Sequence, residues 1–275
     1  MSQQTSIEWT ATYHADGSVT RGASWNYITG GHCEASPGCD RCYARTFAER
    51  FRGVPGHPYE QGFDLRFWPE RLDWPLTRWK RGRRIFVNSM GDWLWKDIPD
   101  DFTLRALDTM LAARQHTYQL LTKRPSRLAN TALMGKLLDL IEERTGQRRW
   151  PGHLHLGVSV ESQAYTWRVD KLRQAVLRAG LALSDVTLFV SAEPLLEEMM
   201  LDLTGIAWLI AGAESGPGAR PMAEDWVRRL RDQCQQAGVA FFYKQNAVQG
   251  HKLSTPLLDG VTWTQFPAER EEARA

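Results

Sequence analysis

The pattern of apolar positions along the chain predicts strands that alternate with helices. Ser24–Thr29 is predicted as a first strand, and six further apolar runs follow it at Arg83–Leu94, Thr117–Pro125, His153–Ser162, Val186–Leu196, Ile206–Gly218 and Val239–Ala247. Helical spacing separates them at Tyr43–Phe51, Phe102–Gln115, Ser126–Arg144, Thr166–Ala179 and Ala223–Gln236. The strands are continuous apolar runs without a polar face, as expected for a parallel sheet that is covered on both sides.

Counted as six strands that alternate with helices, the pattern predicts an α/β fold of the (β/α)6 type, a partial or open version of the eight-fold barrel. One domain, residues 1–266, accounts for the pattern. It contains a loop-rich insertion of basic and aromatic residues at about 56–82. Residues 1–23 are polar and are predicted to form an extension or a short hairpin. The charged tail, residues 267–275, is predicted to be disordered.

Polar residues follow the apolar runs, and active groups collect at the carboxyl ends of the strands in such folds. We therefore expect these strand ends to meet at one edge of the sheet. They are Asn88 to Asp92, Thr122 and Lys123, Ser159 to Glu161, Ser191 to Glu193, Ala213 to Ser215, and Lys244 with Gln245. Each could instead cap the following helix or bond to a loop amide.

Composition is that of an ordinary soluble globular protein, with 43% hydrophobic and 24% charged residues. The net charge of +2 is too small to indicate a polyanionic partner by itself. No apolar run approaches the length that crosses a membrane, and the polar start MSQQTSIEW lacks the order of a signal peptide. We therefore expect a cytoplasmic protein without a membrane partner.

Three of the four cysteines lie within ten residues. Cys33, Cys39 and Cys42 have the spacing C-x5-C-x2-C, whereas Cys234 lies in a helical pattern and is predicted to be a packed thiol. Three thiolates this close can hold a [4Fe-4S] cluster and leave one iron without a protein ligand. The loop could wrap closely around such a cluster, because it contains Gly30, Gly31, Pro37 and Gly38.

Two other interpretations of the cysteines stay open. One is a structural zinc site, for which His32 is the nearby fourth ligand. The other is a disulfide or a set of buried thiols, which is less expected because the cysteine count is low for the length.

The cysteine loop, followed by alternating strands and helices, resembles the radical S-adenosylmethionine (SAM) superfamily. The usual spacing there is C-x3-C-x2-C with an aromatic residue before the last cysteine, whereas Tyr43 follows Cys42 here. The longer first gap and the WN…G…C…PGC-x-x-CYA pattern are similar to a phage-encoded branch that includes Nα-glycinylthymidine radical SAM isomerases of thymidine hypermodification. The resemblance implies a partial TIM-like (β/α)6 barrel of the radical SAM type, located in the host cytoplasm.

The resemblance also implies the cofactors and the residues that hold them. Cys33, Cys39 and Cys42 would bind a [4Fe-4S] cluster, and S-adenosyl-L-methionine would bind its open iron. An electron donor such as flavodoxin or ferredoxin would reduce the cluster, and cleavage of SAM would give a 5'-deoxyadenosyl radical. The candidate SAM-binding residues are Tyr43, Asn88, Ser89, Asp92, Ser159, Glu161 and Glu193. Of these, Asn88, Ser89 and Asp92 suit the ammonium group of SAM, and Ser159, Glu161 and Glu193 suit its ribose and carboxylate.

Four further strand-end residues are candidates for substrate binding: Lys123, Glu214, Lys244 and Gln245. The two lysines could neutralise a cluster or bind a carboxylate or phosphate, although they could equally be surface lysines. Glu214 lies among glycines that allow a close approach to a ligand, and its alternatives are a helix cap or an ion pair with Arg220.

Arginine and lysine alternate with aromatic residues from Arg66 to Arg84. Cations that reach phosphates and rings that stack on an exposed base are typical of nucleic-acid contact. The alternative is a solvated basic loop whose tryptophans anchor it to the barrel.

The sequence as a whole predicts a radical SAM enzyme. By resemblance its substrate is a thymine base of phage DNA that carries glycine, and the reaction is an isomerisation from the nitrogen-linked to the carbon-linked form. One alternative is a radical SAM enzyme that acts on damaged DNA, RNA or a peptide. Another is a non-catalytic nucleic-acid-binding module that is stabilised by zinc.

Overall fold

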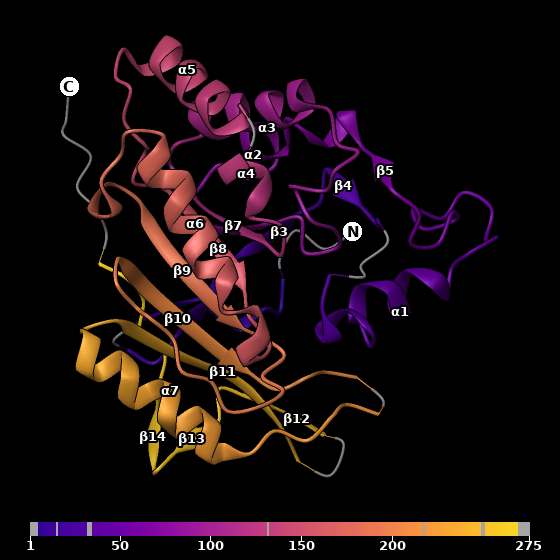
Figure 1. Ribbon diagram of the computed structural model, residues 1–275. Coiled ribbons are helices and arrows are strands. Elements are labelled where there is room, and N and C mark those ends of the chain that lie inside the picture. The colour runs from indigo at the N-terminus through magenta and orange to yellow at the C-terminus, as the bar shows by residue number, and fades with distance from the viewer. Residues whose placement is uncertain are drawn as a thin grey trace.

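A mixed β-sheet that curls into a half-barrel forms the centre of the molecule (Figure 1). The computed structural model describes residues 5–14, 16–31, 35–130, 132–216, 218–248 and 251–268. Within them the sheet has eight strands: β3 (Ala23–Trp25), β6 (Arg84–Val87), β7 (Thr117–Thr122), β8 (Leu154–Ser159), β9 (Thr187–Ala192), β10 (Ile206–Gly212), β11 (Ala240–Val248) and β12 (His251–Ser254).

The strands from β3 to β11 are parallel and lie side by side in chain order. β12 runs antiparallel to β11 at one edge, so the sheet is mixed. The α/β prediction is confirmed, but the count of six strands is wrong. In the described chain the parallel part has seven strands, because β3 also pairs with β6 and the six runs that follow it all join the same sheet.

Helices cover the outer, convex face of this sheet (Figure 1). They are α3 (Asp100–Ala112), α4 (Ser126–Asn130), α5 (Leu133–Thr145), α6 (Trp167–Arg178) and α7 (Glu224–Ala237). Each buries one stripe of apolar residues at helical spacing, as α7 does with Val227, Leu230 and Cys234. Cys234 is a free and buried thiol, as predicted. The single helix predicted for Ser126–Arg144 is wrong, because α4 and α5 are separate helices.

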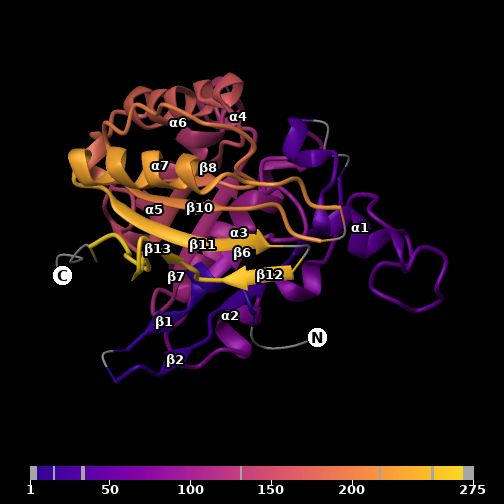
Figure 2. The same ribbon diagram turned by 90° about the horizontal axis from the view of Figure 1, so that it is seen from below.

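The concave face of the sheet is covered by the N-terminal segment, on the side opposite the helices (Figure 2). Trp9 lies in a short 3-10 helix, η1 (Glu8–Thr10), and is 2% exposed. Its ring packs against Phe86, Phe189 and Trp208 at centroid distances of 4.5, 6.2 and 6.0 Å. The side-chain amide of Gln119 donates to the Trp9 carbonyl at 3.2 Å. The segment is therefore part of the core.

β1 (Thr12–Tyr13) pairs antiparallel with β2 (Val19–Thr20), which fits the short hairpin that was one of the two predictions for the N-terminal segment. A second hairpin near the C-terminus pairs β13 (Leu257–Leu258) with β14 (Val261–Thr262). Of the tail predicted to be disordered, residues 269–275 lie outside the described residues.

The basic and aromatic insertion is folded onto the rest of the chain. β5 (Arg66–Phe67) pairs antiparallel with β4 (Ile28–Thr29), and η3 (Pro69–Arg71) and α2 (Trp74–Thr77) follow. The Trp68 ring is 8% exposed and lies under the guanidinium groups of Arg66 and Arg71, at 3.9 and 3.6 Å. The face of the Trp68 ring therefore contacts the chain's own arginines. This contact agrees with the interpretation that tryptophans anchor the basic and aromatic insertion to the rest of the protein.

The loops at the carboxyl ends of the strands begin earlier than predicted. The strand expected to reach Leu94 ends at Val87, because Asn88 adopts a left-handed backbone with φ 56°. Its side-chain oxygen accepts a hydrogen bond from Ile28 N at 3.1 Å. Residues 88–95 therefore form a loop above the sheet.

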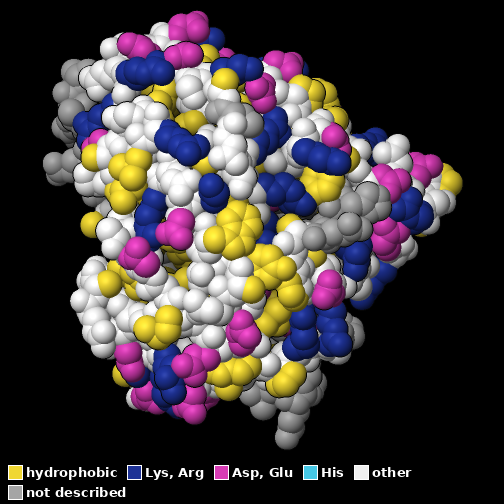
Figure 3. Space-filling model, in the orientation of Figure 1, with side chains coloured by type: hydrophobic (Ala, Val, Ile, Leu, Met, Phe, Trp, Pro, Cys, Tyr) yellow, Lys and Arg dark blue, Asp and Glu magenta, His cyan; other side chains and the backbone are white. Residues whose placement is uncertain are grey.

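Charged side chains on the outer helices are mixed in sign. Over α5 and α7, Lys and Arg lie beside Asp and Glu (Figure 3). Arg144 pairs with Asp108 at 2.6 Å, and Arg228 pairs with Asp225 at 2.7 Å. Among the helices of the described residues, none is long and apolar enough to cross a membrane.

Replacing Trp9 by Ala should lower the free energy of unfolding by about 3 to 5 kcal/mol, because it removes the ring that fills the concave face. Urea denaturation followed by circular dichroism measures this change. Val19→Ala is the control, because Val19 is 52% exposed in the hairpin of the same segment and should change stability by less than about 0.5 kcal/mol. Equal effects of the two substitutions would contradict the role of Trp9 in the core.

Candidate functional site

A cavity of about 370 Å³ opens at the carboxyl ends of β6 to β11. The strand ends that the sequence analysis expects to meet at one edge of the sheet therefore lie around one cavity. The predicted residues that line it are Cys42, Tyr43, Asn88, Ser89, Asp92, Lys123, Ser159, Glu193, Glu214, Lys244 and Gln245. Cys39 and Glu161 are described but do not line it, and Cys33 lies outside the described residues.

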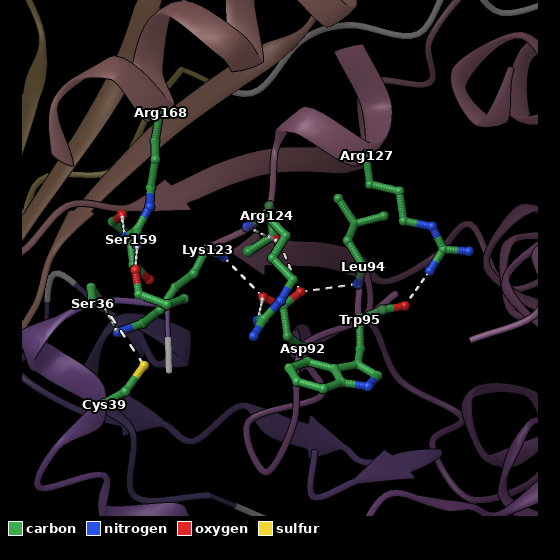
Figure 4. Close-up of polar contacts among 12 residues, drawn as sticks. Ser36, Cys39, Asp92, Leu94, Trp95, Lys123, Arg124, Arg127, Ser159 and Arg168 are labelled. Carbon is green, nitrogen blue, oxygen red and sulfur yellow. Dashed lines mark hydrogen bonds and ion pairs between the residues drawn. The ribbon is translucent and has the colours of Figure 1, made fainter. Parts of the chain in front are cut away.

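Glu161 does not line the cavity, and it holds a buried cluster of charges. Figure 4 labels three of its partners, Ser36, Lys123 and Arg168. The residue is 0% exposed. Its Oε2 accepts from Arg168 Nη1 at 2.8 Å, and its Oε1 accepts from Ser36 Oγ at 2.7 Å and from Lys123 Nζ. Arg168 also donates to the Ala35 carbonyl at 2.9 Å. The cluster therefore ties the loop before Cys39 to the end of β8.

Burial by itself raises the pKa of the Glu161 carboxyl. The charges of Lys123 and Arg168 and the hydrogen bonds from Lys123 and Ser36 outweigh burial, so the pKa is lowered. Both oxygens have protein donors, so Glu161 is placed as an anchor rather than as the ligand-binding residue that the sequence predicted. Gly38 fits here because a Cβ would lie 2.7 Å from Glu161 Cγ. The glycine serves packing against protein, not against a cluster.

Asp92 organises two of the loops at the cavity (Figure 4). Its Oδ1 accepts from Leu94 N at 2.9 Å and from Thr122 Oγ1 at 2.7 Å. Its Oδ2 accepts from Lys123 N and Arg124 Nη1, both at 3.0 Å. Both oxygens are thus occupied by protein donors. Asp92 joins the loops after β6 and β7, which places Arg124 over the ring of Trp95, at 4.2 Å.

Glu214 forms an ion pair with Arg220, which was the structural alternative for this residue. Glu214 Oε2 accepts from Arg220 N at 2.9 Å and from Arg220 Nε at 3.0 Å. Arg220 Nη2 also donates to the Pro37 carbonyl at 2.9 Å. Burial alone raises the pKa of Glu214, but the hydrogen bonds from Arg220 lower it overall. The pair holds the loop after β10 against the cysteine loop.

Tyr43, Asn88 and Ser89 lie together on the cavity wall. Tyr43 donates its hydroxyl to the Ser89 carbonyl at 2.6 Å. Ser89 Oγ exchanges hydrogen bonds with the side chain of Asn26 at 3.2 and 3.3 Å. Asn88 is 2% exposed, and its Nδ2 has no hydrogen-bond partner among the described residues.

Glu193 and Lys244 form an ion pair at the cavity. Glu193 follows β9 and Lys244 lies in β11, with β10 between them. The Lys244 ammonium pairs with Glu193 Oε2, and the two side chains are 16% and 12% exposed. Glu193 Oε1 is buried without a partner in the described part of the chain.

Sequence reasoning missed the N-terminal contribution to the cavity. Ser6, Ile7, Glu8 and Trp9 line it, as does Lys252 of β12. The feature of the sequence that could have indicated this contribution is the apolar and aromatic pair Ile7 and Trp9 within an otherwise polar segment. By contrast, no residue from 66 to 84 lines the cavity among those described.

The predicted cluster of three cysteines is wrong. The described residues contain no group of three or more His, Cys, Asp or Glu side chains that could hold a metal ion. Cys39 is buried and disulfide-bonded, so its sulfur is not a free thiolate, whereas Cys42 is a free thiol. The prediction that a [4Fe-4S] cluster binds here and holds SAM on its open iron is therefore wrong. His32, the proposed zinc ligand, lies outside the described residues.

Replacing Arg168 by Met should lower the free energy of unfolding at pH 7 by about 3 to 5 kcal/mol, because it leaves the buried Glu161 charge with fewer donors. The folded pKa of Glu161 is lowered from its usual 4.5, so its contribution is present above pH 4.5 and is lost as pH falls through the folded pKa. Urea denaturation at several pH values should show the difference shrinking below pH 4.5.

The control for this substitution is Arg148→Met. The Arg148 side chain is 44% exposed and pairs with Asp139 and Glu142 on the surface of α5 and its C-terminal loop. It should have a small effect at every pH. A pH-independent loss in Arg168→Met would contradict the role given to the Glu161 charge.

Comparison with known proteins adds a family but no activity. No curated protein and no solved structure matches the chain. A family model described as "Protein of unknown function (DUF5131)" matches residues 4–267. This family is not a radical SAM family. The radical SAM membership that the cysteine pattern predicted is therefore wrong as well. The chain belongs to the DUF5131 family of proteins of unknown function.

Proposed function

We propose that this protein is an enzyme, that its active site is the cavity at the carboxyl ends of β6 to β11, and that its substrate is a small zwitterion of about nucleoside size. One observation carries the proposal: the Glu193–Lys244 pair lines the cavity, and one Glu193 oxygen has no partner among the described residues. A buried carboxylate oxygen without a donor is costly unless something else supplies one. A substrate is the natural source.

The arrangement of the strands supports an active site at this place. Parallel strands in sequential order around a curled sheet are the arrangement of a partial TIM-like barrel. Such barrels carry their chemistry on the loops at the carboxyl ends of the strands. The volume of about 370 Å³ lies within the usual range for small-molecule sites, roughly 300 to 1,000 Å³.

The chemistry proposed for the pair is acid–base. Lys244 carries three donors and a positive charge, so it would bind the substrate carboxylate or stabilise negative charge that develops beside it. The free oxygen of Glu193 would accept a proton or a donor of the substrate. Ser159 and Ser191 lie opposite each other on neighbouring strands and add two hydroxyl groups to the same wall. Phe86 and Trp95 supply apolar surface for a ring.

A nucleobase that carries an amino acid belongs to this substrate class. The glycine-bearing thymine of DNA that the sequence analysis favoured has a ring, an amine and a carboxylate, and we retain it as a proposal. Support comes from the cations at the cavity, which include Arg41, Arg124 and Lys252. A base in duplex DNA would have to leave the stack to enter. The outer helices carry charges of both signs (Figure 3), so we propose that phosphates contact the cavity rim rather than these helices.

Titration calorimetry with a thymidine whose methyl carbon carries glycine through its nitrogen tests the proposal. We expect the native protein to bind this nucleoside and to bind unmodified thymidine at least about tenfold more weakly, because thymidine lacks the charged groups. Lys244→Met should lose about tenfold or more in affinity. Lys244→Arg keeps the charge and should retain part of the affinity, and circular dichroism checks that both variants fold.

Lys80→Met is the matched control. Lys80 is an exposed lysine in the loop before β6, at the end of the sheet opposite the cavity, and its loss should leave affinity unchanged. No measurable binding to the native protein, or native affinity in Lys244→Met, would defeat the proposed site.

A further inference from the structure

Glu8 is a buried acid on the cavity wall that neither the fold nor the proposed chemistry uses fully. It is 8% exposed and lies in η1, directly before the core residue Trp9. Its Oε1 accepts from Ser254 Oγ and Lys252 Nζ, both at 2.6 Å. Its Oε2 is buried and has no partner among the residues that the structure describes. One oxygen therefore fixes the residue and the other is left over.

We infer that Glu8 and Glu193 together form a subsite for the ammonium group of the ligand. This inference rests on the proposed function, and it names the part of the substrate that these two acids recognise. Both residues line the same cavity, and each has one buried oxygen without a donor in the described chain. Each acid has also used its other oxygen on a lysine, Lys252 for Glu8 and Lys244 for Glu193.

Two acids and two lysines of this wall form a chain of opposite charges. Lys252 contacts Glu8, the positive charge of Lys244 acts on Glu8, and Lys244 contacts Glu193. Burial alone raises the pKa of Glu8, but the hydrogen bonds from Lys252 and Ser254 and the charge of Lys244 bring it below its usual value. Glu8 is therefore ionised at neutral pH and can attract a cation.

A protonated amine is the group that fits two leftover carboxylate oxygens. It carries at least two N–H donors and a positive charge, so it can donate to both acids at once. A hydroxyl donates only one hydrogen and an ether none, so either leaves a buried carboxylate oxygen unpaired. The two acids should therefore select ligands that carry an amine.

The fold holds Glu8 in place for this role. The neighbouring Trp9 packs among Phe86, Phe189 and Trp208, so the backbone of η1 is fixed to the sheet. The bonds from Ser254 and Lys252 then fix the side chain from β12. An acid that is already positioned loses little entropy when it binds a ligand.

Two nucleosides that differ in one atom test the inference. The first is the glycine-bearing thymidine used above, whose linking nitrogen is protonated. The second has an ether oxygen in place of that nitrogen. By calorimetry, the native protein should bind the amine at least about tenfold more tightly than the ether. Glu8→Gln should weaken binding of the amine about tenfold and leave binding of the ether unchanged, so that most of the preference is lost.

Two further variants keep the test decisive. Glu143→Gln is the control, because Glu143 is 65% exposed on α5 and its loss should preserve the preference for the amine. If Glu8→Gln proves unstable, Glu193→Gln tests the other acid and leaves the bonds of Glu8 to β12 intact. It should reduce the preference in the same way.

The possible results separate this inference from the proposed function. If the native protein binds neither nucleoside, the proposed function fails. If it binds both equally well, the cavity binds ligand but the ammonium subsite is overturned. A Glu8→Gln variant that weakens both nucleosides to the same degree would also overturn the subsite, because Glu8 would then act only by shaping the wall.

Discussion

One buried acid, Glu161, holds the wall of the cavity in place without lining the cavity itself. Glu161 takes donors from Arg168, Lys123 and Ser36, and the same Arg168 grips the Ala35 carbonyl. This charge cluster fixes the cysteine loop to the end of β8. A buried charge is tolerated only with a full set of donors, so the loop that supplies Ser36 can scarcely move away.

The acids at the strand ends divide into two kinds. Asp92 and Glu214, like Glu161, have both oxygens occupied by donors from neighbouring loops. Glu193 and Glu8 have one oxygen occupied and one left without a partner in the described chain. The first kind holds the loops around the cavity in place, and the second is the kind that we propose to contact a ligand. Burial does not distinguish them, because both kinds are largely buried, whereas the count of donors at each oxygen does.

Sequence alone predicted the place of the site but not these roles. Apolar runs mark the strands of a parallel sheet, and chain order brings their ends to one edge, so Asn88, Lys123, Glu193 and Lys244 were found together. Whether an acid has donors at both oxygens or at one depends on partners that are distant in sequence. Ser36 and Glu161, for example, lie 125 residues apart. The cysteine spacing showed three sulfurs nearby, but spacing cannot tell a metal ligand from a disulfide or a free thiol.

The sequence analysis did not predict the role of the N-terminal segment, which links the fold to the candidate site. Its composition is polar, so no periodic pattern marked Trp9 as core or Glu8 as part of the cavity. Yet the two residues are adjacent: the ring of Trp9 fills the concave face of the sheet, and the carboxylate of Glu8 reaches the cavity above it. A half-barrel leaves its inner face open to water, so something must fill it. Because the filling segment also contributes a wall of the cavity, any change in how it packs must change the shape and the charge of the site.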